Sequence, residues 1–574
     1  MYSIPGGNAT VLTFPSAFSI IRFRETAATM FRPRLPSRLP VRRALVLAGA
    51  VLAISSAACR GRSGPSNMVL ITLDTTRSDF VGAYRQGNAR TPSLDALAEE
   101  GTLFENANAL IPITLPSHAS MFFSEAPHAV ANYNNGQVVP RSGRRPPLAE
   151  LFRRNGFATA AFVSLGVLTS EFGLDEGFET YADDFPADRW YLTAEEVNAR
   201  VFPWLEANKS RRFFLWVHYS DPHDPYAPPG TPDDMKIGLN GKLLGAFSLE
   251  KGATISARLN LDKGVNRLVI EVANPYPIEA GRYAARLDTL ALGPAGAEGV
   301  SVKFPDDSVF RRDDGVTFLK GRAEIEVSCP EAPRSVTLVL RGKLIVPVEG
   351  ARDGYRREIE FMDGEIGKLL DALRKLGLYD RTAILAAGDH GEGLGEYRTA
   401  FGDPHIGHVH FLYPVYMKVP LIVRVPAARA RGIRRAETAT LLDVAPTVAG
   451  LMGIRSPASF RGRDLLELAP GTETTVFQET YRPEAVQDRF GILERSRHLV
   501  YCPETARYDY FDHENDPDEK SAVTFEDGLP AEGLALKERL DAFVRDILRN
   551  KKNVAVEGRA EEMLKSLGYV GEKK

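Results

Sequence analysis

Three apolar runs in this sequence stop abruptly at side chains that can bind a metal or transfer a proton. They are residues 68–73 before Asp74, residues 213–217 before His218, and residues 384–388 before Asp389 and His390. Such a run is typical of a strand covered on both faces, as in a parallel sheet. A turn with a helix-capping Asp explains one such ending, but agreement among several is harder to attribute to chance. Ligands of open α/β sheets bind beyond the carboxyl ends of the strands, so the pattern predicts an α/β fold with a site at one sheet edge.

Helical patterns separate these runs. Residues 91–101 begin with Thr-Pro-Ser and end at Gly, and residues 355–373 place apolar side chains on one helical face. Residues 148–155 and 441–451 are also expected to be helical. Further buried strands are expected at residues 157–163 and 421–425. Strands that alternate with helices in this way favour a central, mostly parallel sheet.

Residues 235–349 break the pattern. Apolar and polar residues alternate there, as at Ile255, Ala257 and Leu259, and Gly, Asn and Pro turns separate the alternating segments. This segment is therefore expected to be an inserted all-β domain, large enough for a small sandwich core of its own. It contains few aromatic residues, which favours a spacer or lid over a sugar-binding role.

The insert divides the expected catalytic domain into residues 67–234 and residues 350–475. Residues 476–574 carry aromatic residues in looser spacing and are expected to form a smaller C-terminal α+β subdomain, an antiparallel sheet closed by helices.

The first 59 residues are typical of an export signal. Basic residues precede the apolar run at residues 44–54, and small residues lead to Cys59. The apolar run is too short for a comfortable membrane span. Lipidation of Cys59, as in bacterial lipoproteins, and cleavage without a lipid both remain open. With a linker at residues 60–66, we expect an exported protein of the periplasm or lipid-anchored to the cell envelope, with no other membrane contact.

Composition excludes several classes of function. A formal net charge of -3 and a hydrophobic fraction of 44% show no nucleic-acid signature. The three cysteines, Cys59, Cys329 and Cys502, are too few and too scattered for a disulfide framework or a zinc cluster. Two alternatives remain open for Cys329 and Cys502: a disulfide between them, or two buried free thiols.

Five motifs in chain order resemble the sulfatase family of the alkaline phosphatase superfamily. They are residues 73–79 (Leu-Asp-Thr-Thr-Arg-Ser-Asp), 91–95 (Thr-Pro-Ser-Leu-Asp), 114–118 (Thr-Leu-Pro-Ser-His), 389–392 (Asp-His-Gly-Glu) and 407–408 (Gly-His). The resemblance extends over the mature chain apart from the β insert. It implies an alkaline-phosphatase-like sandwich with a central mostly parallel sheet, and a hydrolase of sulfuric or phosphoric esters.

The resemblance also implies a divalent metal site. Its ligands would be Asp74, Asp389, His390 and the hydroxyl of Thr114, which stands at the place of the family's nucleophile. A metal on that oxygen lowers its pKa and polarises the ester, although a helix-capping hydroxyl is the alternative for Thr114. One imidazole among the ligands favours manganese or zinc over calcium, which stays possible.

Thr114 departs from the family pattern. Sulfatases convert a Cys or Ser at this place to formylglycine, whereas threonine is a secondary alcohol and cannot become an aldehyde. We therefore expect a covalent ester on Thr114 that water cleaves. His118 replaces the motif's Arg, and residues 163–166 (Val-Ser-Leu-Gly) replace a segment with cationic contacts. This loss of positive charge favours monoanionic phosphate diesters or phosphonates, while family membership favours sulfate.

Histidines remain for proton transfer and binding. His218 resembles the family's acid for the leaving oxygen, because imidazole titrates near neutral pH. His118, His223 and His408 are the expected substrate contacts, and His408 could also bind a second metal with Asp221 or His223. A structural histidine is the alternative for each. Arg77 is expected to anchor the first loop and not to touch substrate.

The leading hypothesis is an exported, metal-dependent hydrolase with Thr114 as nucleophile and His218 as acid. Its partner would be a small-molecule or glycan ester. Two alternatives remain: transfer of a phospho group to an envelope lipid or glycan, and non-catalytic binding of anionic glycans. The sequence does not name the natural substrate, the number of metals or the oligomeric state.

Overall fold

The computed structural model describes residues 64–550 apart from short gaps. The gaps are residues 131–132, 141–144, 187–188, 225, 227, 229–233, 250–253, 274–282, 294–298, 305–306, 312–314, 332, 346, 399–401, 403, 427–430, 482–486 and 525–527. The expected signal, Cys59 and most of the linker lie outside the described residues. Among the described residues, no helix combines the length and apolarity needed to cross a membrane.

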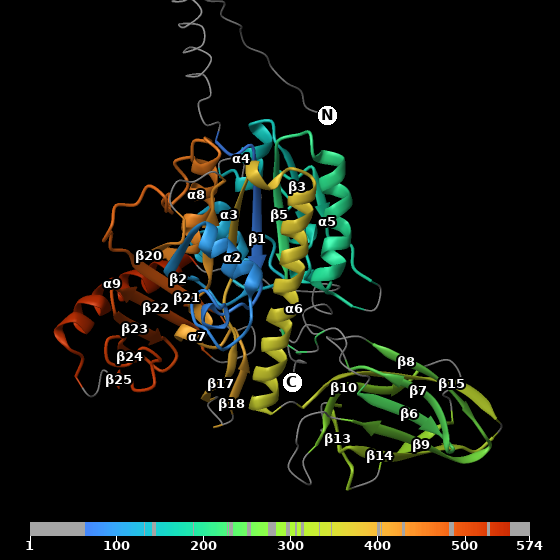
Figure 1. The fold of residues 1–574 in the computed structure, drawn as a ribbon. Coiled ribbons are helices and arrows are strands. Elements are labelled where there is room, and N and C mark those ends of the chain that lie inside the picture. The colour runs from blue at the N-terminus through green and yellow to red at the C-terminus, as the bar shows by residue number, and fades with distance from the viewer. Residues whose placement is uncertain are drawn as a thin grey trace, which may run out of the picture. The chain divides into compact units, whose positions relative to one another are not determined.

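A mixed eight-stranded sheet carries the site (Figure 1). Its order is β20-β2-β19-β16-β1-β5-β3-β4. The bounds are β1 (Asn67–Leu73), β2 (Thr102–Asn108), β3 (Ala158–Phe162), β4 (Thr180–Ala182), β5 (Phe213–Tyr219), β16 (Thr382–Gly388), β19 (Leu421–Arg424) and β20 (Ile433–Thr440). Only β19 runs antiparallel to its neighbours in this sheet. The predicted α/β class with a mostly parallel sheet is confirmed.

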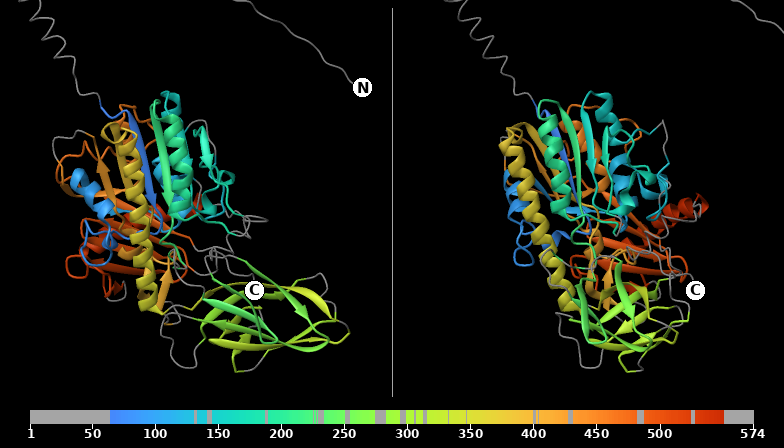
Figure 2. Two further views of the ribbon diagram at one scale, coloured as in Figure 1. Left: turned by 45° about the vertical axis from the view of Figure 1, so that its right-hand side comes forward. Right: turned by 90° about the vertical axis from the view of Figure 1, so that its right-hand side faces the viewer.

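Helices cover both faces of this sheet, which explains why every residue of β1 is buried. Met68 and Leu70 pack in one core with α3 (Thr114–Phe123), α4 (Leu148–Arg154) and α8 (Val444–Leu451). Val69 and Ile71 point to the opposite core, with α2 (Pro92–Glu100), α5 (Ala194–Asn208) and α6 (Val348–Lys375). Figure 2 shows α5 and α6 side by side along that face. A strand with two apolar faces has no polar alternation, which is the pattern of the sequence.

The insert is formed by two antiparallel five-stranded sheets, β12-β13-β10-β15-β8 and β11-β14-β9-β6-β7, around an apolar core of their own. Its strands are β6 (Met235–Leu239), β7 (Lys242–Phe247), β8 (Ile255–Leu261), β9 (Gly264–Val272), β10 (Ala285–Leu292), β11 (Ser301–Lys303), β12 (Val309–Arg311), β13 (Thr317–Leu319), β14 (Arg322–Cys329) and β15 (Arg334–Leu344). Burial alternates along β8, as period-two side chains on a half-buried sheet require.

The C-terminal part is an antiparallel sheet in the order β21-β22-β23-β24-β25. Its elements are β21 (Thr475–Thr480), β22 (Arg489–Glu494), β23 (Arg497–Cys502), β24 (Arg507–Asp512), β25 (Val523–Thr524) and α9 (Ala531–Asn550). Ile111 and Ile113 share its core, so this sheet supports the chain just before α3. Cys329 and Cys502 are both buried and form no disulfide, which excludes the pairing between them.

The remaining elements are short. They are η1 (Ser78–Phe80), η2 (Pro127–Val130), η3 (Gly166–Leu168), η4 (Ser170–Phe172), η5 (Tyr379–Arg381), β17 (Gly393–Arg398), β18 (Pro404–Gly407), α7 (Pro414–Met417) and η6 (Leu441–Asp443). The β17–β18 hairpin follows directly after residues 389–392 and belongs to the surroundings of the site.

Candidate active site

Strand register brings the predicted residues together. Leu73 pairs with Gly388 and with Tyr219, so β1, β16 and β5 end at the same level. Asp74 and Asp389 directly follow the ends of β1 and β16, and His218 is one residue from the end of β5. All three side chains are fully buried. The sheet edge predicted from separate apolar runs is therefore a single place in the structure.

A buried acidic pair lies at this edge. Asp389 Oδ1 accepts hydrogen bonds from the backbone amides of Thr75 and His390, at 3.0 and 2.7 Å. Asp389 Oδ2 and Asp74 Oδ1 have no hydrogen-bond partner among the described residues. Candidate ligand atoms of Asp74, Asp389 and His390 lie within 4.8 Å of one another. Two buried, unsatisfied carboxylate oxygens are costly without a counter-charge, so this donor set fits a divalent cation.

The electrostatics of the pair support this interpretation. Burial and the neighbouring charge of Asp74 raise the pKa of Asp389 well above its ordinary value. Burial alone would raise the pKa of Asp74 too, but its hydrogen bond with His218 and the nearby imidazoles hold it below the ordinary value. Without a cation the pair therefore favours one negative charge, and a bound cation would allow both carboxylates to ionise.

Thr114 begins α3 beside these ligands. Its Oγ1 lies 3.4 Å from His390 Nε2, and its side chain is buried. The N-cap of α3 is Ile113, so Thr114 is not the capping residue. A side chain from outside the helix, Asn135, accepts a hydrogen bond from the first-turn amide of Leu115 at 2.9 Å. Ser117 Oγ donates to the backbone oxygen of Asp389 at 2.7 Å and ties the first turn of α3 to the end of β16. A helix N-terminus favours negative charge, which suits a nucleophile that attacks an anionic group.

His218 is held on both sides of its ring. Its Nδ1 accepts from the backbone amide of Ser164 at 3.3 Å and lies 2.8 Å from Ser164 Oγ. A backbone amide can only donate, so the proton of a neutral ring is on Nε2. That nitrogen lies 3.2 Å from Asp74 Oδ2 and donates to it. Ser164 thus sets the tautomer of His218, a role that sequence reasoning missed, since the segment 163–166 was noted only for its lost cations.

His118 is one turn along α3 from Thr114. Its Nδ1 donates to the Thr114 carbonyl oxygen at 2.8 Å, and its ring centroid is 5.0 Å from that of His218. Burial and the neighbouring imidazole of His218 lower the pKa of His118 to about 3. His118 is therefore neutral at ordinary pH and does not replace the charge of the family's Arg.

His223 and His408 form a group of rings with His390. The ring centroid of His408 is 4.6 Å from that of His390 and 5.1 Å from that of His223. His408 Nδ1 lies 2.8 Å from Glu392 Oε2. Burial lowers the pKa of His408, but Glu392 outweighs it and raises the pKa above the ordinary value. His408 is thus the histidine of this cluster best able to carry positive charge.

Glu392 and Asp221 have roles that the motifs did not reveal. Besides His408, Glu392 accepts from the hydroxyl of Tyr226 at 2.8 Å, and it is fully buried. Asp221 Oδ1 accepts from the backbone amide of Ala194 at the start of α5, at 3.0 Å. Among the described residues, the groups of at least three side chains that are close enough to bind one metal ion do not include His408, His223 or Asp221. The second metal near His408 therefore remains a prediction.

Arg77 anchors the first loop. Its guanidinium pairs with Asp79 at 2.8 Å and with Glu396 at 2.6 Å, and it donates to the Glu392 backbone oxygen at 3.1 Å. Because its donors are engaged in this way, Arg77 fixes the loop after Asp74 relative to β17.

Comparison with known protein families identifies the family of this chain. The sulfatase family model matches residues 66–454. The chain belongs to the sulfatase family. A second model, the C-terminal part of N-sulphoglucosamine sulphohydrolase, matches residues 407–546. This sulfatase is a hydrolase of sulfate or phosphate esters. Enzymes of the sulfatase family generally depend on a divalent metal.

Similar sulfatases act on varied substrates, as their names state. The chain is 21% identical over 408 residues to the ulvan-active sulfatase of Formosa agariphila, covering 70% of this chain and 64% of that relative. It is 21% identical over 497 residues to the N-acetylglucosamine-6-O-sulfatase of Bacteroides thetaiotaomicron, covering 80% and 82%. It is 24% identical over 442 residues to human iduronate 2-sulfatase, covering 72% and 74%.

Solved structures share the fold of this sulfatase. One is an enzyme in complex with its substrate D-glucosamine-2-N,6-O-disulfate, with a TM-score of 0.53, 17% identity and coverage of 87% of this chain and 100% of that chain. Another is the phosphonate monoester hydrolase of Agrobacterium radiobacter, with a TM-score of 0.54, 17% identity and coverage of 85% and 96%. At this identity the likeness establishes the fold alone.

Proposed function

We propose that this sulfatase-family chain is an exported, metal-dependent hydrolase that cleaves a sulfate or phosphate ester, or a phosphonate, through a covalent intermediate on Thr114. One observation carries the proposal: the Thr114 hydroxyl is at the start of α3, 3.4 Å from His390 Nε2, beside a buried acidic pair with unsatisfied oxygens. A hydroxyl in this position serves attack on an anionic centre, because the helix N-terminus and a cation both stabilise the charge that develops.

Asp74, Asp389, His390 and Thr114 are the residues that would hold the metal. When bound, a divalent cation lowers the pKa of a coordinated hydroxyl and draws electrons from the ester oxygens. One nitrogen among oxygen ligands favours Mn²⁺ or Zn²⁺, with Ca²⁺ as the alternative. Ser117 and the backbone amides of Thr75 and His390 keep Asp389 in place.

The reaction would proceed in two displacements. Deprotonated Thr114 Oγ1 forms a bond to sulfur or phosphorus as the bond to the leaving oxygen breaks, and the leaving oxygen takes a proton from an imidazole. Water then cleaves the Thr114 ester and releases sulfate or the phosphorus acid. His218 is the acid expected from the family, and His408 is the second candidate, since Glu392 raises its pKa.

Leaving-group dependence separates these two histidines. An acid matters most when the leaving oxygen is basic, so its loss should slow alkyl esters far more than 4-nitrophenyl esters. The test is therefore to measure the turnover of His218→Gln and His408→Gln on both types of ester. The acid shows a large difference between the two esters, whereas a residue that only positions Asp74 or binds substrate slows both alike.

The substrate class follows from charge. Among the site residues, Arg77 is paired with two carboxylates, His118 is neutral, and His408, whose pKa Glu392 raises, is paired with that carboxylate. This supports monoanionic esters such as phosphate diesters, phosphonate monoesters or sulfate monoesters over phosphate monoester dianions. The names of the related sulfatases favour a sulfated glycan, and the phosphonate monoester hydrolase fold favours a phosphonate.

The deciding experiment combines Thr114→Ala and Thr114→Ser with a panel of chromogenic sulfates, phosphate mono- and diesters and phosphonates, assayed with added Mn²⁺ or Zn²⁺. Thr114→Ala should lose turnover and keep its circular dichroism spectrum, whereas Thr114→Ser keeps a nucleophilic hydroxyl. Quenched wild-type reactions should show a sulfuryl or phosphoryl adduct on the Thr114 peptide. Full turnover by Thr114→Ala would end the proposal.

Export belongs to the same proposal and rests on the signal-like residues before Cys59. Cells that express the full chain and receive a labelled fatty acid should yield labelled protein if Cys59 is lipidated, and Cys59→Ala should remove the label. Mature, exported but unlabelled protein would favour cleavage without a lipid. Retention of the whole chain in the cytoplasm would contradict export.

A further inference from the structure

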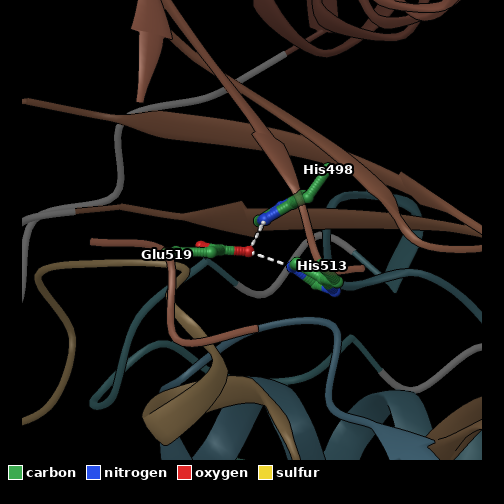
Figure 3. A group of neighbouring side chains, drawn as sticks. All are labelled: His498, His513 and Glu519. Carbon is green, nitrogen blue, oxygen red and sulfur yellow. Dashed lines mark hydrogen bonds and ion pairs between the residues drawn. The ribbon is translucent and has the colours of Figure 1, made fainter. Parts of the chain in front are cut away.

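A second group of metal-capable side chains lies in the C-terminal sheet, and the function proposed above does not use it. His498 on β23, His513 just after β24 and Glu519 converge on one point (Figure 3). His498 Nδ1 lies 2.6 Å from Glu519 Oε1, and His513 Nε2 lies 2.5 Å from the same oxygen. Two imidazoles and one carboxylate thus direct their ligand atoms into one small volume.

The three side chains of this cluster are largely buried. The side chains of Glu519 and His498 are 0% and 2% exposed, and that of His513 is 12% exposed. Glu519 Oε2 and His498 Nε2 are buried without a hydrogen-bond partner among the described residues. Burying an ionised carboxylate with one oxygen unsatisfied is costly unless a cation neutralises it.

The hydrogen bond to Glu519 uses only one ring nitrogen of His498. If neutral His498 donates from Nδ1 to Glu519, its Nε2 is an acceptor. Both His498 Nε2 and Gln478 Oε1 lie close to Gly491. A Cβ atom at Gly491 would be 2.8 Å from His498 Nε2 and 3.2 Å from Gln478 Oε1. Gln478 Oε1 is also a buried acceptor without a partner. With a cation on Nδ1, the ring proton is on Nε2, so this nitrogen becomes a donor.

We propose that His498, His513 and Glu519 bind a structural Zn²⁺ ion in this sulfatase. Two imidazole nitrogens and a carboxylate oxygen are a common protein ligand set for zinc, and a water can complete the tetrahedron on the side of His513 that is open to solvent. On binding, each coordinating imidazole nitrogen offers its lone pair to the metal, and the protons that stood between the rings and Glu519 are released or move to the other ring nitrogen.

The ion would stabilise a segment that supports the active site. Residues 516–521 carry Glu519, whose backbone φ of 52° is unusual for a non-glycine residue. The Tyr397 hydroxyl donates to the Asp518 carbonyl oxygen at 2.5 Å, and Lys520 Nζ donates to the Glu396 carbonyl oxygen at 3.1 Å. Glu396 is one of the two carboxylates that pair with Arg77. Zinc at Glu519 would therefore stabilise β17 through the neighbouring Asp518 and Lys520, without contact with the substrate.

The test uses the full-length chain, stripped of metal with a chelator and titrated with Zn²⁺ alone. Metal content is measured by elemental analysis for wild type, His513→Gln, Glu519→Gln and a matched control, His128→Gln. His128 also pairs with a buried glutamate, Glu479, at 3.0 Å, but belongs to no group of three. We expect His513→Gln and Glu519→Gln to bind one equivalent less than wild type, and His128→Gln to match wild type.

Two further readouts make the result decisive. Zn²⁺ should raise the Tm of Asp389→Asn, whose catalytic site is impaired, but not that of Asp389→Asn/His513→Gln. Co²⁺ in place of zinc should give the intense visible absorption of a tetrahedral site in Asp389→Asn and lose it in the double variant. If wild type and His513→Gln bind equal amounts of zinc, or if the Co²⁺ signal is independent of His513, the cluster is only a hydrogen-bonded clamp and the proposal fails. Because Thr114 plays no part in these readouts, failure of the proposed function would leave them unchanged.

Discussion

At the residue scale, the site is governed by buried charge. Asp74 and Asp389 face each other with oxygens that the described residues do not satisfy, and His218 compensates only one of them. In the proposed mechanism Thr114 depends on this arrangement, since a threonine hydroxyl is a weak nucleophile by itself. The same residue type elsewhere on α3 would be inert.

Replacement of Asp389 by Asn tests this electrostatic argument. Without metal, Asp389→Asn should be at least as stable as wild type, because burial already disfavours a second negative charge in the pair. With Mn²⁺ at about 100 times the Kd of the site beside Asp74, wild type should gain about 2.7 kcal/mol of unfolding free energy from this site and the variant nearly none. Denaturant unfolding with chelator and with Mn²⁺ measures both. A variant that gains as much as wild type would show that Asp389 is not a ligand.

Ser164 is expected to act through His218. Loss of its hydroxyl in Ser164→Ala leaves the His218 ring less firmly oriented towards Asp74, so metal affinity or turnover should fall by about 10- to 100-fold. Metal titration separates this from a direct substrate effect, because KM should change little. Ser164→Thr keeps a hydroxyl and serves as the conservative control. Unchanged metal affinity and turnover in Ser164→Ala would exclude the positioning role.

At the element scale, secondary structures far apart in the chain hold one another through single polar contacts. Ser117 joins α3 to the end of β16, and Asp363 on α6 accepts from the amides of Ser93 and Leu94 at the start of α2. His128 on η2 joins Glu479 on β21, which links the region after α3 to the C-terminal sheet. The contact of Ser117 fixes α3, and that of His128 connects the region after α3 to the C-terminal sheet.

The His128–Glu479 pair predicts a pH dependence. Burial lowers the pKa of His128, but the hydrogen bond and charge of Glu479 outweigh it and raise the pKa above 6.5. A raised pKa in the folded state stabilises the protein below the unfolded-state value of about 6.5, and this stabilisation is lost as the pH rises through the folded pKa. The stability difference between wild type and His128→Gln should therefore be larger at pH 6 than at pH 9, by chemical denaturation. A difference that does not vary with pH would refute the ion pair.

At the scale of the whole molecule, apolar side chains form separate cores. The two faces of the central sheet, the insert and the C-terminal sheet each bury their own set of residues. The core of the insert is built only from residues 235–344. A segment with a complete core of its own is expected to unfold as a separate cooperative unit.

Calorimetry of the full chain should therefore resolve at least two transitions. Mn²⁺ should raise the transition temperature of the catalytic part, which contains the proposed ligands, and leave that of the insert unchanged. The isolated insert supplies the reference temperature for its own transition. A single transition that moves as a whole with metal would mean that the insert and the catalytic part unfold together.

The sequence alone determined the class of fold and most of the candidate ligands. Apolar runs, helical periodicity and strand alternation depend on which faces are buried, and burial is written locally along the chain. The short apolar run that became β19 was therefore predictable as a strand, but its antiparallel direction was not. The sulfatase motifs likewise pointed to Asp74, Thr114, Asp389 and His390 before any contact was known.

Only the tertiary structure decided which of these residues meet and what holds them. The register of β1 with β5 and β16 places the acidic pair beside His218, and Ser164 selects the tautomer of that ring. Glu392 and the cluster around Glu519 became recognisable only when distant segments were folded together. The physical reason is that a hydrogen bond or a shared cation depends on distances of a few ångströms between residues far apart in the chain, and local sequence periodicity carries no information about them.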